Sequence, residues 1–283
     1  MSVIQTLKGL FARRSPKKKV LAVAFGSGGA KGMAHLGVLK ALEEENITFH
    51  WYAGTSIGSI VGALKAYGYA TDELKEVVLN ICLKQYVRYL RPYMDMAFIE
   101  EFLNGYLHNA EFSNLSKPFY AWATDKENME GVLLQSGSVA RACTASSAVP
   151  PYFHSVSIEG RELIDGAYTN PVPADVLRAR GADFILGVDL NAVSEEESEL
   201  RPHSVFTRIL SDTLDSTVKI KTATNALTRG YSACDVMLRP PLGIYTPLDA
   251  TKASLIEIYE IGYHTAREQM PVIKQKIAEI LHK

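Results

Sequence analysis

Ser56 is the residue whose surroundings most clearly indicate chemistry. It stands at the centre of Gly54-Thr55-Ser56-Ile57-Gly58, between a predicted strand over residues 49–53 and a predicted helix over residues 59–66. A Gly-x-Ser-x-Gly sequence between a strand and a helix is typical of a nucleophile elbow, whose flanking glycines allow a turn tight enough to expose the serine hydroxyl. The helix start also favours a developing alkoxide. The pattern predicts a nucleophilic serine at position 56.

A second glycine-rich turn could supply the hydrogen-bond donors that such a serine needs. Gly28-Gly29-Ala30-Lys31-Gly32 follows a predicted strand over residues 20–25 and precedes a predicted helix over residues 33–45. Adjacent strand-to-helix turns of a parallel sheet open on the same edge, so this loop is a candidate oxyanion hole. A nucleotide-binding loop stays an alternative, although Lys31 is not followed by Ser or Thr and occupies the third glycine position of a dinucleotide fingerprint.

The candidate base is Asp165, in Asp165-Gly166-Ala167. It lies just past a predicted strand over residues 161–164 and follows the small-residue stretch 145–151. An Asp-Gly pair is most often only a turn. The position of Asp165 beside the strand end and the small-residue stretch is what favours its assignment as the base. His203 remains the alternative, because it alone lies on a loop late enough to complete the Ser, acid, His order of α/β-hydrolases.

Taken together, these motifs resemble those of the patatin-like phospholipases over about residues 20–189. The motifs that carry the resemblance, in chain order, are Gly28-Gly29-Ala30-Lys31-Gly32, Gly54-Thr55-Ser56-Ile57-Gly58, residues 145–153 and Asp165-Gly166-Ala167. Ser27 departs from the pattern, because many members have another glycine there.

The resemblance implies a serine acyl hydrolase that cleaves lipid or acyl esters through an acyl-enzyme. It implies a dyad of Ser56 and Asp165 without a catalytic histidine. The oxyanion hole would come from backbone N–H groups around Gly28, Gly29 and Ala30, with Lys31 at the basic position of the loop. No metal or other cofactor is implied. A regulatory protein with an intact but little-used site is a further alternative.

The order of predicted elements indicates an α/β fold, and the resemblance implies a three-layer α/β/α sandwich around a mainly parallel sheet. Two strand–turn–helix units in succession imply right-handed crossovers between parallel strands. Further helices are predicted at residues 72–83, 95–107, 138–145 and 174–180, and further strands at 119–124, 131–134, 154–158, 161–164 and 184–189. The C-terminal third is expected to be mostly helical and interrupted at Pro271.

Composition indicates a globular protein of the cytoplasm. The chain has 283 residues, of which 47% are hydrophobic and 22% charged, and we expect one domain over residues 20–283. Three cysteines without CxxC spacing suggest buried thiols rather than disulfides or zinc ligands. No apolar run approaches the ~18 residues of a membrane span. We expect no nucleic-acid partner, and the oligomeric state does not follow from the sequence.

Residues 1–19 form a basic amphipathic extension. They carry six positive charges and no acid, and their apolar residues recur at helical spacing. Such a segment could lie on an anionic membrane surface, or it could pack on the body of the protein with its basic residues in solvent. The aromatic segment 82–107 also has two interpretations. It could line an acyl pocket or contact the bilayer, or it could be ordinary helix-packing surface, which we favour.

Overall fold

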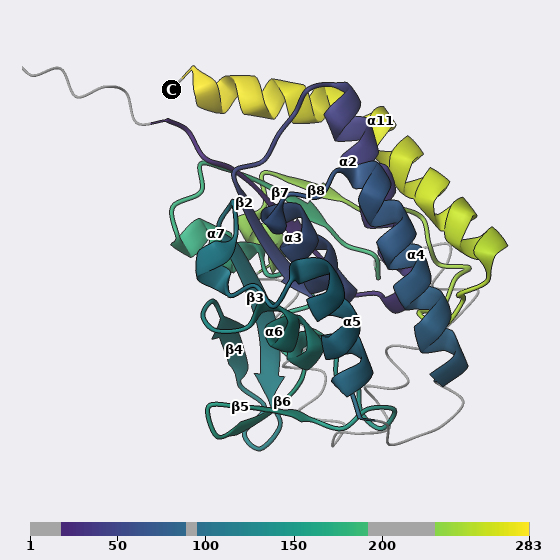
Figure 1. Cartoon of the computed structure of the whole chain (residues 1–283). Helices are drawn as coiled ribbons and strands as arrows, with labels where there is room; N and C mark the ends of the chain where they lie inside the picture. Colours follow the sequence, from purple (N-terminus) through teal and green to yellow (C-terminus); the bar gives the residue numbers. More distant parts are fainter. Residues whose placement is uncertain (1–17, 89–94, 192–229, 283) are drawn as a thin grey trace, which may run out of the picture.

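The computed structural model describes residues 18–88, 95–191 and 230–282, and for residues 83–88 it describes the backbone alone. A central sheet runs through the molecule (Figure 1), and its described strands follow the order β5-β6-β3-β2-β1-β7-β8, with β4 paired to β3. The strands are β1 (Leu21–Phe25), β2 (Trp51–Thr55), β3 (Phe119–Asp125), β4 (Gly131–Leu134), β5 (Val156–Ile158), β6 (Arg161–Asp165), β7 (Phe184–Val188) and β8 (Val236–Leu238).

The helices cover the sheet from both sides. They are α2 (Met33–Glu44), α3 (Ile57–Tyr67), α4 (Thr71–Arg88), α5 (Ala97–Leu107), α6 (Val139–Ser146), α7 (Ala174–Ala179) and α11 (Lys252–Leu281), with the short 3-10 turns η1 (Gly29–Gly32), η2 (Phe112–Asn114) and η3 (Gly166–Tyr168). Each strand and helix predicted between residues 20 and 189 is confirmed, with bounds that differ by a few residues.

Strand direction explains how the sheet can carry a site at one edge. Strands β3, β2, β1, β7 and β8 are parallel neighbours, whereas β4 and β6 run antiparallel to β3, and β5 runs antiparallel to β6. Phe25 pairs with Gly54, so β1 and β2 end side by side. The glycine-rich turns that follow these two strands therefore open on the same edge, as the sequence predicts.

Alternate residues of β1 show that the sheet lies between two apolar layers. Val23 and Phe25 are fully buried in the larger core, which the helices α2, α3, α5 and α11 share. Ala22 and Ala24 face a smaller core that contains Leu177 of α7. This period-two alternation confirms the three-layer α/β/α arrangement.

The predicted interruption of the C-terminal helix at Pro271 is wrong. Helix α11 continues through this residue from Lys252 to Leu281. Proline removes one helical hydrogen bond, but Met270 and Ile273 are buried beside it, and their packing outweighs that loss. Close packing on α2 (Figure 1) depends on Gly37, because a Cβ there would lie 2.0 Å from the carbonyl oxygen of Tyr259.

Strand β8 was not predicted from the sequence. It has three residues, Val236–Leu238, and it pairs in parallel with β7. Three residues are too few to show a strand period, so only the pairing with β7 identifies them as a strand. Among the described residues, no helix is long and apolar enough to cross a bilayer.

The cysteines and the aromatic segment behave as buried packing groups wherever the structure describes them. Cys82 and Cys143 are buried and Cys234 is half-buried, all three are free thiols, and burial raises the pKa of each to about 12. Phe98 and Phe102 pack against the larger core, as the helix-packing interpretation predicts. The side chains of residues 83–94, residues 1–17, the acidic stretch 194–199 and His203 lie outside the described residues, so the predictions for them stay predictions.

Candidate active site

Ser56 occupies a strained turn between β2 and α3. Its backbone has φ +56° and ψ −129°, a positive-φ conformation that costs a non-glycine residue about 1–3 kcal/mol. A Cβ on Gly54 would lie 2.2 Å from the carbonyl oxygen of Gly58, and one on Gly58 would lie 2.3 Å from that of Phe25. Both elbow glycines are therefore required by backbone contacts, and the turn has the geometry of a nucleophile elbow.

Three side chains hold this turn. The N–H of Ser56 donates to Ser146 Oγ at 2.9 Å, and Ser59 Oγ donates to the carbonyl oxygen of Ser56 at 2.7 Å. Thr55 Oγ1 donates to the carbonyl oxygen of Asn170 at 2.8 Å. The sequence analysis did not single out Ser146 or Asn170, although Ser146 belongs to the small-residue stretch before Asp165.

Asp165 reaches the elbow from the neighbouring antiparallel strand. It is the last residue of β6 and pairs with Ala123 of β3, while Thr55 pairs with Trp122, the residue before Ala123. The carboxylate is fully buried. The structure therefore brings together the two residues that the sequence analysis paired as nucleophile and base.

The carboxylate of Asp165 has one occupied and one open oxygen. Oδ1 accepts a hydrogen bond from the N–H of Ala167 at 2.8 Å. Oδ2 accepts no hydrogen bond of good geometry from the described residues, histidines included. Ser56 is nevertheless close enough for its hydroxyl to act on the carboxylate, because it is among the causes that lower the pKa of Asp165. The Ser56 hydroxyl and the Asp165 carboxylate therefore make a loose contact without a hydrogen bond of good geometry, and such contacts often tighten when substrate binds.

Burial dominates the electrostatics of Asp165. It raises the pKa of this carboxyl to about 7, against the opposing effects of the Ser56 hydroxyl and the Ala167 N–H. Desolvation penalises the ionised form because the interior solvates charge poorly. A carboxylate with a pKa near 7 is a far better proton acceptor at neutral pH than an ordinary aspartate.

The glycine loop lies against the elbow, but only part of it offers donors. A Cβ on Gly32 would lie 2.3 Å from Ile57 Cγ1, which places the loop directly beside the start of α3. The N–H of Ala30 donates to the carbonyl oxygen of Pro247 at 2.8 Å, and that of Lys31 donates to Gly28 at 3.1 Å. The amides of Gly28 and Gly29 make no hydrogen bond with any described residue. Of the four predicted residues, these two therefore have backbone donors available.

The side chain of Lys31 anchors the loop. It is buried, and its Nζ donates to the carbonyl oxygen of Leu190 at 3.0 Å, just beyond β7. Ser27 is held on the same side, because its N–H donates to Pro171 and its carbonyl oxygen accepts from Asn191 Nδ2 at 2.8 Å. The loop is therefore fixed to the end of β7 as well as to the elbow.

His35 is a further brace of the loop, at a position that the sequence does not predict as part of the site. It is fully buried, and its Nε2 lies 2.8 Å from the carbonyl oxygen of Gly26. Burial lowers the pKa of His35 to about 4, so the ring is neutral at pH 7 and the Nε2–H donates to Gly26. This ring supports the start of the glycine loop.

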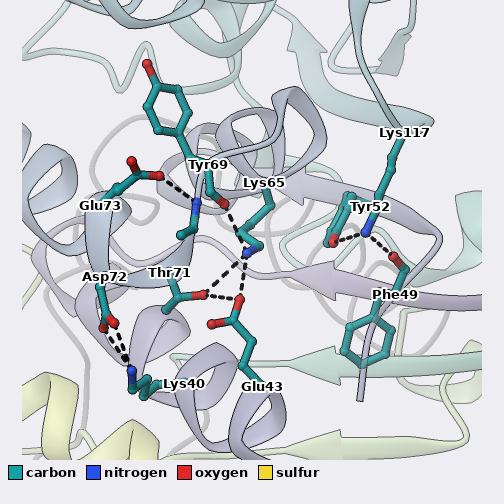
Figure 2. Close-up of polar contacts among 11 residues, drawn as sticks. Lys40, Glu43, Phe49, Tyr52, Lys65, Tyr69, Thr71, Asp72, Glu73 and Lys117 are labelled. Carbon is teal, nitrogen blue, oxygen red and sulfur yellow. Dashed lines mark hydrogen bonds and ion pairs between the residues drawn. The ribbon is translucent and has the colours of Figure 1, made fainter. Parts of the chain in front are cut away.

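A dense polar network lies at the opposite end of α3 (Figure 2). Lys65 Nζ donates to Glu43 Oε1 at 2.7 Å and to the carbonyl oxygen of Tyr69 at 3.1 Å, and Thr71 Oγ1 donates to the same Glu43 oxygen at 2.6 Å. Lys65 lies about two and a half helical turns beyond Ser56, roughly 13 Å along α3. The network ties α2, α3 and α4 together and does not belong to the candidate site.

A surface groove of about 410 Å³ lies at the amino end of β3, where Phe119, Tyr120 and Arg180 line it. The Arg180 guanidinium sits 5.1 Å above the Tyr120 ring. Ser56 follows the carboxyl end of β2, which runs parallel to β3, so this groove lies at the opposite edge of the sheet.

Solved structures share this architecture. The structure of VipD from Legionella pneumophila aligns with a TM-score of 0.55 and 14% identity, covering 91% of this chain and 67% of that one. Human GIVD cytosolic phospholipase A2 aligns with a TM-score of 0.54 and 13% identity, covering 93% of this chain and 60% of that one. At these identities the likeness shows the fold alone.

Sequence comparison adds the family. The chain is 28% identical to human patatin-like phospholipase domain-containing protein 6 over 275 residues, covering 86% of this chain but only 20% of that protein. It is 33% identical over 177 residues to an uncharacterized NTE family protein of Mycobacterium bovis, covering 60% of this chain and 49% of that one. The patatin-like phospholipase family model matches residues 23–178, more than half of the chain. With the elbow at Ser56 and the buried carboxylate of Asp165 inside the matched segment, this chain belongs to the patatin-like phospholipase family.

Proposed function

We propose that this protein is a lipid acyl hydrolase in which Ser56 is the nucleophile and Asp165 the general base. The observation that carries the proposal is the strained serine of the elbow beside a buried carboxylate with one open oxygen. A serine hydroxyl needs an adjacent base to act as a nucleophile at neutral pH, and Asp165 is the group that the fold brings to it.

The reaction follows from these groups. As Ser56 Oγ attacks the ester carbonyl carbon, its proton passes to Asp165 Oδ2, and the N–H groups of Gly28 and Gly29 stabilise the oxyanion. The tetrahedral intermediate collapses when the alcohol leaves with the proton from Asp165, and an acyl-enzyme remains. Water then gives a proton to Asp165 and attacks the acyl carbon. Collapse releases the carboxylic acid and returns the proton to Ser56.

The substrate class rests on the family. The matched family and the human relative are named phospholipases, so we propose ester-linked acyl lipids as substrates, cleaved by a cytoplasmic protein at a membrane surface. Residues 1–19 are the proposed contact with anionic lipid. A deletion of these residues, assayed with and without anionic vesicles, tests this part. Equal binding and equal rates for both chains would show that the segment has another role.

The dyad is tested with single substitutions and a short soluble acyl ester. Ser56→Ala and Asp165→Ala should each abolish hydrolysis, and a serine-directed phosphonate should label the wild-type chain at Ser56. His203→Ala is the matched control and should retain wild-type rates. Loss of activity in the His203 variant with retention in the Asp165 variant would place the protein in the Ser-Asp-His class. Labelling without any ester turnover would favour a regulatory protein with a little-used site.

A further inference from the structure

The hydroxyl of Ser146 joins the nucleophile to the central sheet. Ser146 is the last residue of α6 and is fully buried. Its Oγ accepts the N–H of Ser56 at 2.9 Å and donates to the carbonyl oxygen of Trp122 at 2.6 Å. The direction of both bonds is fixed, because an N–H can only donate and a carbonyl oxygen can only accept.

The Ser146 hydroxyl replaces a hydrogen bond between β2 and β3 that the strained turn at Ser56 prevents. The ladder between β2 and β3 ends at the pair Thr55 and Trp122, and the next residue, Ser56, turns to φ +56°. An N–H at the start of a helix has no partner within that helix, and an unpaired buried N–H costs about 1–3 kcal/mol. The Ser146 hydroxyl therefore bridges the two strands at the point where their own hydrogen bonds stop.

The segment that carries Ser146 also holds the base. The N–H of Asp165 donates to the carbonyl oxygen of Ala148 at 2.9 Å. A Cβ on Gly166 would lie 2.1 Å from the carbonyl oxygen of Trp122, so the peptide that accepts from Ser146 also packs against the residue after the base. Ser146 thus bonds to the nucleophile, and Ala148, two residues later, bonds to the base.

We propose that Ser146 is a positioning residue that fixes the Ser56 peptide and thereby aims Ser56 Oγ at Asp165. The inference rests on the proposed function, and it concerns the alignment of the dyad. Loss of the hydroxyl leaves both the Ser56 N–H and the Trp122 carbonyl without a partner, and the elbow relaxes toward another hydrogen bond. A misplacement of about 1 Å at a reacting atom can cost about 100-fold in rate.

Ser147 provides a matched control. Ser147 is also a buried serine at the end of α6. Its Oγ, however, donates to the carbonyl oxygen of Cys143 within the same helix at 2.9 Å. Ser147→Ala removes a hydroxyl of the same kind without touching Ser56 or Asp165. A purely structural role predicts similar effects of the two alanine variants on catalysis, whereas a positioning role predicts different ones.

The experiment measures kcat and KM on a soluble short-chain ester, the rate of phosphonate labelling at Ser56, and the melting temperature. Ser146→Ala should lower kcat and the labelling rate about 10- to 100-fold with KM within about twofold, whereas Ser147→Ala should keep wild-type kcat. Ser146→Cys keeps a side chain that can donate and accept, with a larger and weaker hydrogen-bonding atom, and its kcat should fall between those of wild type and Ser146→Ala. Wild-type kcat and labelling in folded Ser146→Ala or Ser146→Cys, or an equal loss in Ser147→Ala, would overturn the proposal. A wild-type chain that neither turns over ester nor is labelled would instead refute the proposed function.

Discussion

Asp165 approaches Ser56 from the opposite strand direction. Ser56 follows the carboxyl end of β2, and Asp165 ends β6, which runs antiparallel to β3. Because β4 takes one edge of β3, β2 and β6 share the other edge and meet end to end, at the pairs of Thr55 with Trp122 and of Asp165 with Ala123. Asp165 is therefore held by a strand that pairs with β3, where its carboxylate is fully buried, and not by a solvent-exposed loop. This burial sets the chemistry of the site, because it keeps the pKa of Asp165 near 7.

The pH dependence of hydrolysis should report this pKa. In the proposed mechanism Asp165 must be ionised to accept the proton of Ser56, so kcat/KM should rise about tenfold per pH unit below pH 7 and level off above it. The measurement is kcat/KM for an uncharged short ester between pH 5 and 9. A profile that is flat from pH 5 to 7 would mean that the base has an ordinary carboxyl pKa.

Asp165→Asn should inactivate the protein and stabilise it at alkaline pH. The folded pKa of about 7 lies above the reference value of 3.8, so the folded state holds a proton that the unfolded state releases between these pH values. The contribution of Asp165 to the free energy of unfolding therefore falls as pH rises from about 4 to 7, whereas the lowered pKa of His35 acts in the opposite direction equally in wild type and variant. A pKa difference of about three, at 1.36 kcal/mol for each unit, gives an upper limit of about 4 kcal/mol.

Urea unfolding of wild type and Asp165→Asn at pH 4 and pH 8 checks this prediction. The free energies of unfolding should be similar at pH 4, and the variant should be the more stable chain at pH 8. A less stable variant at pH 8 would show that the buried carboxylate is better solvated by its surroundings than its pKa indicates.

Gly58→Ala should unfold the elbow. The added Cβ would lie 2.3 Å from the carbonyl oxygen of Phe25 and 2.6 Å from that of Gly26, both backbone atoms that cannot move independently of β1. We expect a loss of about 2–4 kcal/mol in the free energy of unfolding, together with loss of activity. Gly105→Ala in α5 is the control, because a Cβ there would have no atom within 4 Å. This variant should gain up to about 1 kcal/mol in the free energy of unfolding. Thermal unfolding of both variants provides the comparison.

Lys65→Ala should separate stability from catalysis. The Lys65 side chain is 11% exposed. Its ammonium binds Glu43, Thr71 and the Tyr69 carbonyl at the end of α3 far from Ser56 (Figure 2). Its removal should cost about 1–3 kcal/mol, because the carbonyl and carboxylate lose a shielded charged donor. Activity per folded molecule should not change.

Lys276→Ala, which breaks an exposed pair with Glu279, is the control and should cost less than about 0.5 kcal/mol in the same denaturation assay. A reduced kcat in Lys65→Ala would show that the network reaches the elbow through α3.

The sequence by itself determined the features that depend on neighbours along the chain. The elbow at Ser56 is visible as a glycine pattern because Gly54 and Gly58 stand two positions to either side of it, although the contact that requires Gly58 comes from Phe25 of β1. The strand and helix order is visible for the same reason, since periodicity records which face of each element is buried. These local patterns were sufficient to predict the α/β fold and the tight turn at Ser56, whose role as nucleophile stays a prediction.

Tertiary structure alone decided which groups meet these residues. Antiparallel pairing of β6 places Asp165 beside the elbow, and Ser146 reaches Ser56 only because α6 packs over β3. The Ala30 amide, one of the predicted oxyanion-hole donors, donates to the carbonyl oxygen of Pro247. Pro247 is far from Ala30 in the sequence, so no local pattern predicts this contact. Hydrogen bonds and desolvation act between atoms that are close in space, so the pairing of donors and the pKa of a buried carboxyl are set by packing and not by residue order.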